Sequence, residues 1–143
     1  MPDVKVSFAW RRHPGGRPTA RLRERAVSVL GRVGIDGVEV GVLVCDDRAI
    51  RALNRSYRGK DAATDVLSFP SGDRLPEGGS YLGDIAISLD TAGREAQAAG
   101  IGTIEEIERL LIHGLLHLAG FDHETDGGEM RALERTIRRK ERR

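Results

Sequence analysis

Residues 103–123 read TIEEIERLLIHGLLHLAGFDH, and this stretch decides both the fold and the chemistry that we expect. Thr103 followed by Glu106 fits a capping box, a pattern that predicts the beginning of a helix. We expect this helix to run to about Ala119 and to stop at Gly120, because glycine readily takes the left-handed conformation behind a helix. The stretch therefore predicts a capped helix with a tight turn after it.

Three of the four histidines of the chain lie in this stretch, at His113, His117 and His123. On a helix, His113 and His117 are about 6 Å apart along one face. Gly120 lets the chain reverse, so that His123 can approach the same face. Three imidazoles that leave a fourth position open are typical of a catalytic zinc site. We predict one zinc ion per chain on these three ligands, with packed or solvated histidines as the alternative.

The spacing H-x3-H-x5-H is that of the metzincin zinc peptidases, including a glycine three residues before the third histidine. In those peptidases the residue after the first histidine is a glutamate that acts as general base. Gly114 stands at this position and accepts no proton. The metal geometry is therefore kept while the peptidase base is lost, which leaves a zinc peptidase as the less favoured alternative.

Phosphodiester cleavage suits such a site better. Zinc lowers the pKa of a bound water to about 7 and polarises a phosphoryl oxygen. The reaction also needs a cation for the charge that develops on the phosphate oxygens. Arg58 is our candidate, and a surface arginine at a helix end is the alternative.

Composition fits one globular domain with a polyanionic partner. The chain has 143 residues, 39% of them hydrophobic, and a net charge of +1, which predicts one domain over 1–143. Basic residues, mostly arginine, gather in 11–25 and 135–143, and arginine matches phosphate geometry, although a solvated surface is the alternative. No apolar stretch is long enough for a membrane span, and no secretory signal is evident, so we expect a cytoplasmic protein. The single cysteine, Cys45, is expected to be a core residue.

The remaining pattern predicts an α+β domain. Residues 38–45 read as a strand buried on both faces, and Tyr57 is expected to point inward with Ile50 and Leu53. Thr19 is expected to cap the first helix. The full expectation is strands over 4–10, 38–45, 64–69 and 81–88 and helices over 19–33, 46–57, 89–99, 103–119 and from 126 onward.

Three motifs carry a resemblance to a known family. The first is LNRSYRGKD over 53–61, running into TDVLSFP over 64–70. The second is LGDIAIS over 82–88, and the third is the histidine motif over 113–123. In this order and at these separations, the chain resembles the YbeY family of single-domain bacterial endoribonucleases, which are ribosomal RNA maturation factors.

The resemblance implies a zincin-like α+β fold, with a small mixed four-stranded sheet covered by about five helices. It implies zinc on His113, His117 and His123, and cleavage of single-stranded RNA. It also implies maturation of the 3′ end of the 16S ribosomal RNA, ribosome quality control, and the small ribosomal subunit as partner. The important arginine of the family falls on Arg58, and we take Arg58 and His113 as catalytic residues.

Two departures from the family pattern are small. Ala63 stands where proline is usual, and Phe121 stands where tyrosine is usual, so a hydroxyl at position 121 is not essential here. Asp65 and Asp84 lie in the shared motifs, where they either orient a histidine and shape the cleft or serve turns and strand edges. Asp122 and Glu124 flank the third histidine and are further candidates for its support.

Two hypotheses of different classes remain beside the peptidase. One is a zinc-dependent endoribonuclease. The other is a ribosome-assembly factor without catalytic activity, in which zinc has a structural role. Three histidines without a fourth protein ligand favour the enzyme, because structural zinc sites are usually closed by four protein ligands. The sequence leaves the cleavage site, the attacking group, any general base and the oligomeric state open.

Overall fold

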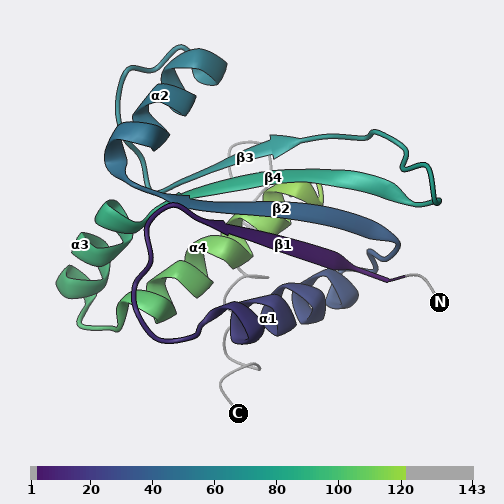
Figure 1. The fold of residues 1–143 in the computed structure, drawn as a ribbon, viewed down its shortest axis with the longest axis horizontal. Coiled ribbons are helices and arrows are strands. Elements are labelled where there is room, and N and C mark those ends of the chain that lie inside the picture. Colours follow the sequence, from purple (N-terminus) through teal and green to yellow (C-terminus); the bar gives the residue numbers. More distant parts are fainter. Residues whose placement is uncertain (1–2, 122–143) are drawn as a thin grey trace.

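The computed structural model describes residues 3–121 of the chain. Strands and helices alternate up to α2, and two strands and two helices then follow, which is the order that the sequence predicts (Figure 1). The elements in chain order are β1 (Lys5–Trp10), α1 (Thr19–Arg32), β2 (Val38–Cys45), α2 (Asp47–Arg58), β3 (Val66–Pro70), β4 (Ser80–Ser88), α3 (Leu89–Ala99) and α4 (Thr103–Leu118).

The four strands form one mixed sheet in the order β1-β2-β4-β3. β1 and β4 run parallel to β2, whereas β3 runs antiparallel to β4 and forms one edge of the sheet. The parallel partners need long crossovers, which α1 and the α2–β3 segment supply. The predicted α+β class and four-stranded mixed sheet are confirmed.

The two faces of the sheet carry different cores. One face packs its valines and isoleucines against α1 and α4 in the main core. The other face has a smaller core, in which α2 covers only one end of the sheet. Figure 1 accordingly shows α1 and α4 together on one side and α2 standing at one end. The members of the smaller core are Cys45, Ile50, Leu67 and Ala86, with Leu43, Ala49, Leu53 and Phe69 packed against them.

Strand β2 corrects one expectation. Its residues alternate between buried and half-buried over Val38–Val44, so the prediction of a strand buried on both faces is wrong. Gly41 and Leu43 belong to the half-buried set because no helix within residues 3–121 covers that part of the second face. Cys45 is fully buried, as predicted, and burial raises the pKa of its thiol to about 11.

Helix α4 is the central element of the main core. It contacts the sheet, α1 and α3, and for this reason most of its circumference is apolar. Its fully buried residues include Ile107, Leu111, Ile112, Leu115 and Leu116. Two buried residues of the helix are acidic, Glu106 and Glu108. Glu108 is held by two arginines of α1, with Arg21 Nε at 3.2 Å and Arg25 Nη1 at 3.3 Å.

Two predicted helix caps are wrong. Helix α4 has Gly102 as its N-cap, and Thr103 is already helical, so the capping box does not form. Glu106 instead accepts from Arg109 at 2.6 and 2.7 Å. Helix α1 has Pro18 as its N-cap, and the Thr19 hydroxyl accepts from the Trp10 indole at 3.0 Å. Both threonines lie one residue too late to cap.

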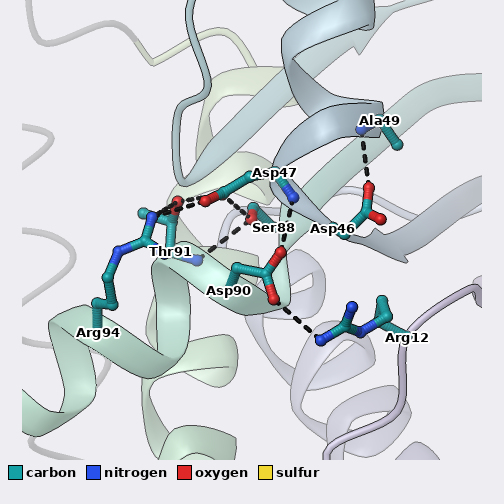
Figure 2. Close-up of polar contacts among 8 residues, drawn as sticks. All are labelled: Arg12, Asp46, Asp47, Ala49, Ser88, Asp90, Thr91 and Arg94. Carbon is teal, nitrogen blue, oxygen red and sulfur yellow. Dashed lines mark hydrogen bonds and ion pairs between the residues drawn. The ribbon is translucent and has the colours of Figure 1, made fainter.

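Asp47 fixes the beginning of α2 against the beginning of α3 (Figure 2). Its Oδ1 accepts from the hydroxyls of Ser88 and Thr91, each at 2.6 Å, and Arg94 donates to Oδ2 at 2.7 Å. These bonds, led by the one from Ser88, lower the pKa of Asp47 to about 2. The neighbouring Asp46 caps α2 by accepting from the Ala49 amide at 2.8 Å.

The same junction reaches the end of β1. Asp90 accepts from the Asp47 amide at 3.0 Å and from Arg12 at 3.1 Å (Figure 2). The loop after β1 is thereby tied to the ends of β2 and β4, where α2 and α3 begin. The position of α2 relative to the sheet is thus set by polar contacts as well as by the smaller core.

Residues 3–121 contain four of the five expected helices, and the fifth, from 126 onward, lies outside the described residues. Within the described part, no helix combines the length and the apolar character needed to span a membrane.

Candidate metal centre and its surroundings

The histidine pair lies near the end of α4. The rings of His113 and His117 are 4.6 Å apart between centroids and are tilted by 56°. This arrangement agrees with the one-face geometry that the i, i+4 spacing predicts. Two imidazoles this close are able to offer nitrogen ligands to one ion, so the donor set that the structure describes fits a zinc centre.

Both rings are accessible in a part of α4 that is otherwise buried. From Leu110 to Leu118, every residue except the two histidines is buried. The apolar positions anchor the helix in the main core, while the two histidines remain half-buried. A rigid helix that presents two half-buried imidazoles is a suitable base for a metal site.

Gly114 explains why this helix takes no glutamate after its first histidine. A Cβ added at Gly114 would lie 2.9 Å from Cγ2 and 3.0 Å from Cδ1 of Ile85 on β4. Ile85 is fully buried, so it has little room to move. Gly114 faces β4, where α4 lies too close to the sheet for a larger side chain. A glutamate, the general base of a metzincin peptidase, does not fit at this position.

The third predicted ligand, His123, lies outside the described residues, as do Asp122 and Glu124. Among residues 3–121, no group of three or more histidine, cysteine, aspartate or glutamate side chains is arranged to hold a metal ion. The described part therefore contributes a pair of ligands, and the three-histidine set stays a prediction.

Arg58 is the last residue of α2 and is exposed. The helix ends there because Gly59 takes a left-handed conformation with φ of 70°. α2 packs on the sheet face opposite to α4, so the helices that carry Arg58 and the histidine pair lie on opposite sides of the sheet. Its catalytic role stays a prediction.

The edge strand β3 links these two sides. Ser68 donates its hydroxyl to the Gly114 carbonyl at 3.3 Å, next to His113. The following residue, Phe69, points to the other face and contacts the ring of Tyr57 at 5.0 Å between centroids. Consecutive residues of one edge strand therefore touch the histidine helix and the arginine helix.

The two aspartates of the shared motifs have structural contacts. Asp65 accepts from the Val66 amide at 2.8 Å, at the beginning of β3. Asp84 accepts from the hydroxyl of Tyr81 on its own strand. In the described part of the chain neither has a hydrogen bond to a histidine ring, and their role at the metal stays untested.

A carboxylate cluster between α3, α4 and β3 was not foreseen. Glu95 is surrounded by Glu106 and Asp65, and Arg109 lies 3.5 Å from its carboxylate. Burial, followed by the neighbouring Glu106, raises the pKa of Glu95 to about 8. The sequence signal was Glu106, which the capping-box interpretation had assigned to the backbone.

Comparison with known proteins gives the family. The model of the endoribonuclease YbeY family matches residues 18–141. An endoribonuclease YbeY from Anaeromyxobacter sp. is 50% identical over 132 residues, which are 90% of this chain and 68% of the relative. The chain belongs to the endoribonuclease YbeY family. Membership confirms the predicted enzyme class, an endoribonuclease, within a family of metal-dependent nucleases.

Further relatives differ in how much of their length this YbeY-family chain spans. A YbeY of Geobacter sulfurreducens is 43% identical, over 92% of this chain and 88% of the relative. One from Myxococcus xanthus is 50% identical, but the chain spans only 44% of its length. The solution structure of TM1509 from Thermotoga maritima matches with a TM-score of 0.63 and 26% identity, covering 94% of this chain and 85% of that one.

Proposed function

We propose that this endoribonuclease cleaves single-stranded RNA with one zinc ion held by His113, His117 and His123. The observation that carries the proposal is the pair of half-buried imidazoles, 4.6 Å apart between ring centroids, in the part of α4 from Leu110 to Leu118 that is otherwise buried. Bound zinc supplies Lewis acidity toward a phosphoryl oxygen and a water acidified enough to attack near neutral pH.

Arg58 binds the phosphate in this proposal. It is exposed at the end of α2, and the preceding residue, Tyr57, packs on Phe69 of the edge strand. Ser68 of the same strand touches Gly114 beside His113. A single RNA strand that crosses this edge brings one phosphate toward both sides, and a guanidinium is well suited to the charge on its oxygens.

We further propose that the substrate is a precursor of ribosomal RNA and that the cleavage matures the 3′ end of the 16S ribosomal RNA. In this proposal the enzyme acts in the cytoplasm on the small ribosomal subunit, and it also takes part in ribosome quality control. Family membership supports this part of the proposal. A zinc peptidase is disfavoured because the position of its base is packed against Ile85.

The test is cleavage of a ribosomal RNA precursor by the purified chain, with zinc content measured on the same sample. We expect about one zinc per chain and cleavage that a chelator abolishes and added zinc restores. His113→Ala should lose both zinc and cleavage. His13→Ala is the matched control, because His13 is exposed in the loop after β1 and should leave both unchanged.

Arg58 is tested separately. Arg58→Ala should keep the zinc and lose most of the cleavage, whereas Arg48→Ala, at the other end of the same helix, should keep both. Full activity of Arg58→Ala would remove Arg58 from the mechanism. A His113→Ala variant that lacks zinc and still supports ribosomal RNA processing would favour the assembly-factor hypothesis instead.

A further inference from the structure

The sheet face that α2 covers only in part contains a hollow. The strand register places four residues in one row across this face: Ser7, Gly41, Asp84 and Phe69. All four line a cavity of about 590 Å³, with Leu53 and Tyr57 of α2 at its side, and Ser7 and Gly41 take up little of its space. A volume of this size is within the range of small-ligand sites.

Tyr57 forms an exposed wall of this hollow. It was expected to point inward, but its side chain is 71% exposed, so that prediction is wrong. The ring lies edge-on to Phe69, at 5.0 Å between centroids and 60° between planes. An exposed aromatic ring that lines a cavity and contacts a second ring is a suitable surface for stacking an unpaired base.

The charges around the hollow are separated. The cationic side is the C-terminal end of α2 and the residue following its C-cap, with Arg55, Arg58 and Lys60. The hollow itself is lined by the carboxylates of Asp73 and Asp84. A phosphate is favoured over α2 and repelled from the hollow, where a neutral group with hydrogen-bond donors is favoured instead.

The floor of the hollow is built around Asp84. Asp84 is exposed, and its Oδ1 accepts from the Tyr81 hydroxyl. Burial, followed by the bond to Asp84, raises the pKa of Tyr81 to about 12, so the phenol keeps its proton and continues to donate. A Cβ at Gly41 would lie inside van der Waals contact of both groups, which explains the glycine.

We propose that this hollow receives one unpaired base of the RNA substrate, which stacks on Tyr57 and donates its exocyclic amine to Asp84. The inference rests on the proposed function, because it says where one base of the cleaved RNA strand binds. Arg55 and Arg58, exposed on α2 next to Tyr57, hold the flanking phosphates. Adenine, cytosine and guanine carry such an amine and uracil does not, so the site selects against uracil.

The test is equilibrium binding of labelled single-stranded oligo(C) and oligo(U) to the full chain, with chelator present to prevent cleavage. Tyr57→Ala should weaken the binding of oligo(C) about tenfold to a hundredfold, since stacking on an aromatic side chain has that effect on affinity. Tyr57→Phe should restore binding. Asp84→Asn should remove or reverse the preference for oligo(C) over oligo(U).

The matched control is Val27→Ala. Val27 is the other large exposed hydrophobic residue in the described part of the chain, and it lies on α1, on the opposite side of the sheet. It should leave binding unchanged. Thermal melts of all variants establish that they fold, and the high exposure of Tyr57 predicts little loss of stability on its truncation.

Two results overturn the inference while leaving the proposed function intact. In the first, the wild-type chain cleaves RNA and Tyr57→Ala binds RNA with unchanged affinity. In the second, Tyr57→Ala keeps its RNA affinity and loses only the binding of a protein partner. An unchanged preference between oligo(C) and oligo(U) in Asp84→Asn removes Asp84 from the site. A wild-type chain that neither binds nor cleaves RNA contradicts both the inference and the proposed function.

Discussion

Gly114→Ala is the substitution whose effect follows most directly from the packing of α4. The added methyl would lie 2.9, 3.0 and 3.2 Å from three carbons of Ile85, a fully buried and β-branched side chain. Overpacking of this kind costs about 1–3 kcal/mol. Replacing a helical glycine by alanine contributes about 1 kcal/mol in the opposite direction. The variant should therefore be less stable than the wild type by about 0–2 kcal/mol.

Gly93→Ala is the matched control for this prediction. Gly93 lies within α3, and a Cβ there would meet nothing within 4 Å. It should stabilise the protein by about 0.5–1 kcal/mol through helix propensity alone. Because the propensity gain is common to both variants, the difference between them measures the overpacking, about 1–3 kcal/mol.

The assay is urea denaturation followed by far-UV circular dichroism, with the midpoints compared at equal m-values. Zinc affinity is measured on the same samples, and Gly114→Ala should bind zinc more weakly because His113 is the adjacent residue. If the two alanine variants are stabilised equally, the approach of α4 to β4 is looser than described, and the steric argument against a peptidase base fails.

Three other predictions concern titratable groups. Because the folded pKa of Glu95 is raised to about 8, its contribution to stability is present below pH 4.5 and is lost as the pH rises toward 8. Glu95→Gln should therefore flatten the dependence of stability on pH. At pH 8 it should raise the free energy of unfolding by about 1–2 kcal/mol, a figure reduced for the partial exposure of Glu95 and its coupling to neighbouring acids. The pKa of Asp47 is lowered to about 2, so its contribution to stability is present above pH 4 and is lost as the pH falls toward 2. Asp47→Asn should lower the free energy of unfolding by about 2 kcal/mol at pH 7. If urea denaturation shows the same loss of stability at acid pH in this variant, the contacts described for Asp47 between α2 and α3 are refuted. Cys45, buried and with a pKa near 11, should react with a thiol reagent at pH 8 only at the rate of unfolding, and rapid labelling of the native protein would contradict its burial.

The strong periodic patterns were sufficient to predict most of the fold. The apolar run of α4 and the alternation of β1 gave their elements to within about two residues, because burial on one side enforces a period. The exact caps were not predictable from the sequence, since Thr103 and Thr19 each begin a helix instead of preceding it. A shift of one residue in the start of a helix changes which side chain can hydrogen-bond to the free backbone amides of its first turn.

Tertiary context explains the errors around α2. Tyr57 has the helical spacing of a core residue, but α2 covers only one end of its sheet face, so the ring remains exposed. For the same reason β2 is buried on one face only. How far a helix extends over a sheet depends on contacts such as those of Asp47 with α3, which no local pattern contains.

The candidate site was predictable in part. The i, i+4 spacing gave the proximity of His113 and His117, because it depends on helix geometry alone. The position of Arg58 relative to this pair depends on the edge strand β3 between them. That position could not be predicted from the sequence. The single domain over 1–143 and the ligand His123 stay predictions.

Zinc X-ray absorption spectroscopy on the purified chain shows whether three imidazoles hold the metal. We expect one zinc per chain, nitrogen or oxygen neighbours at about 2.0–2.1 Å, the scattering pattern of three imidazoles, and loss of one imidazole in His123→Ala. A sulfur neighbour at about 2.3 Å, or a spectrum that His123→Ala leaves unchanged, would contradict this expectation.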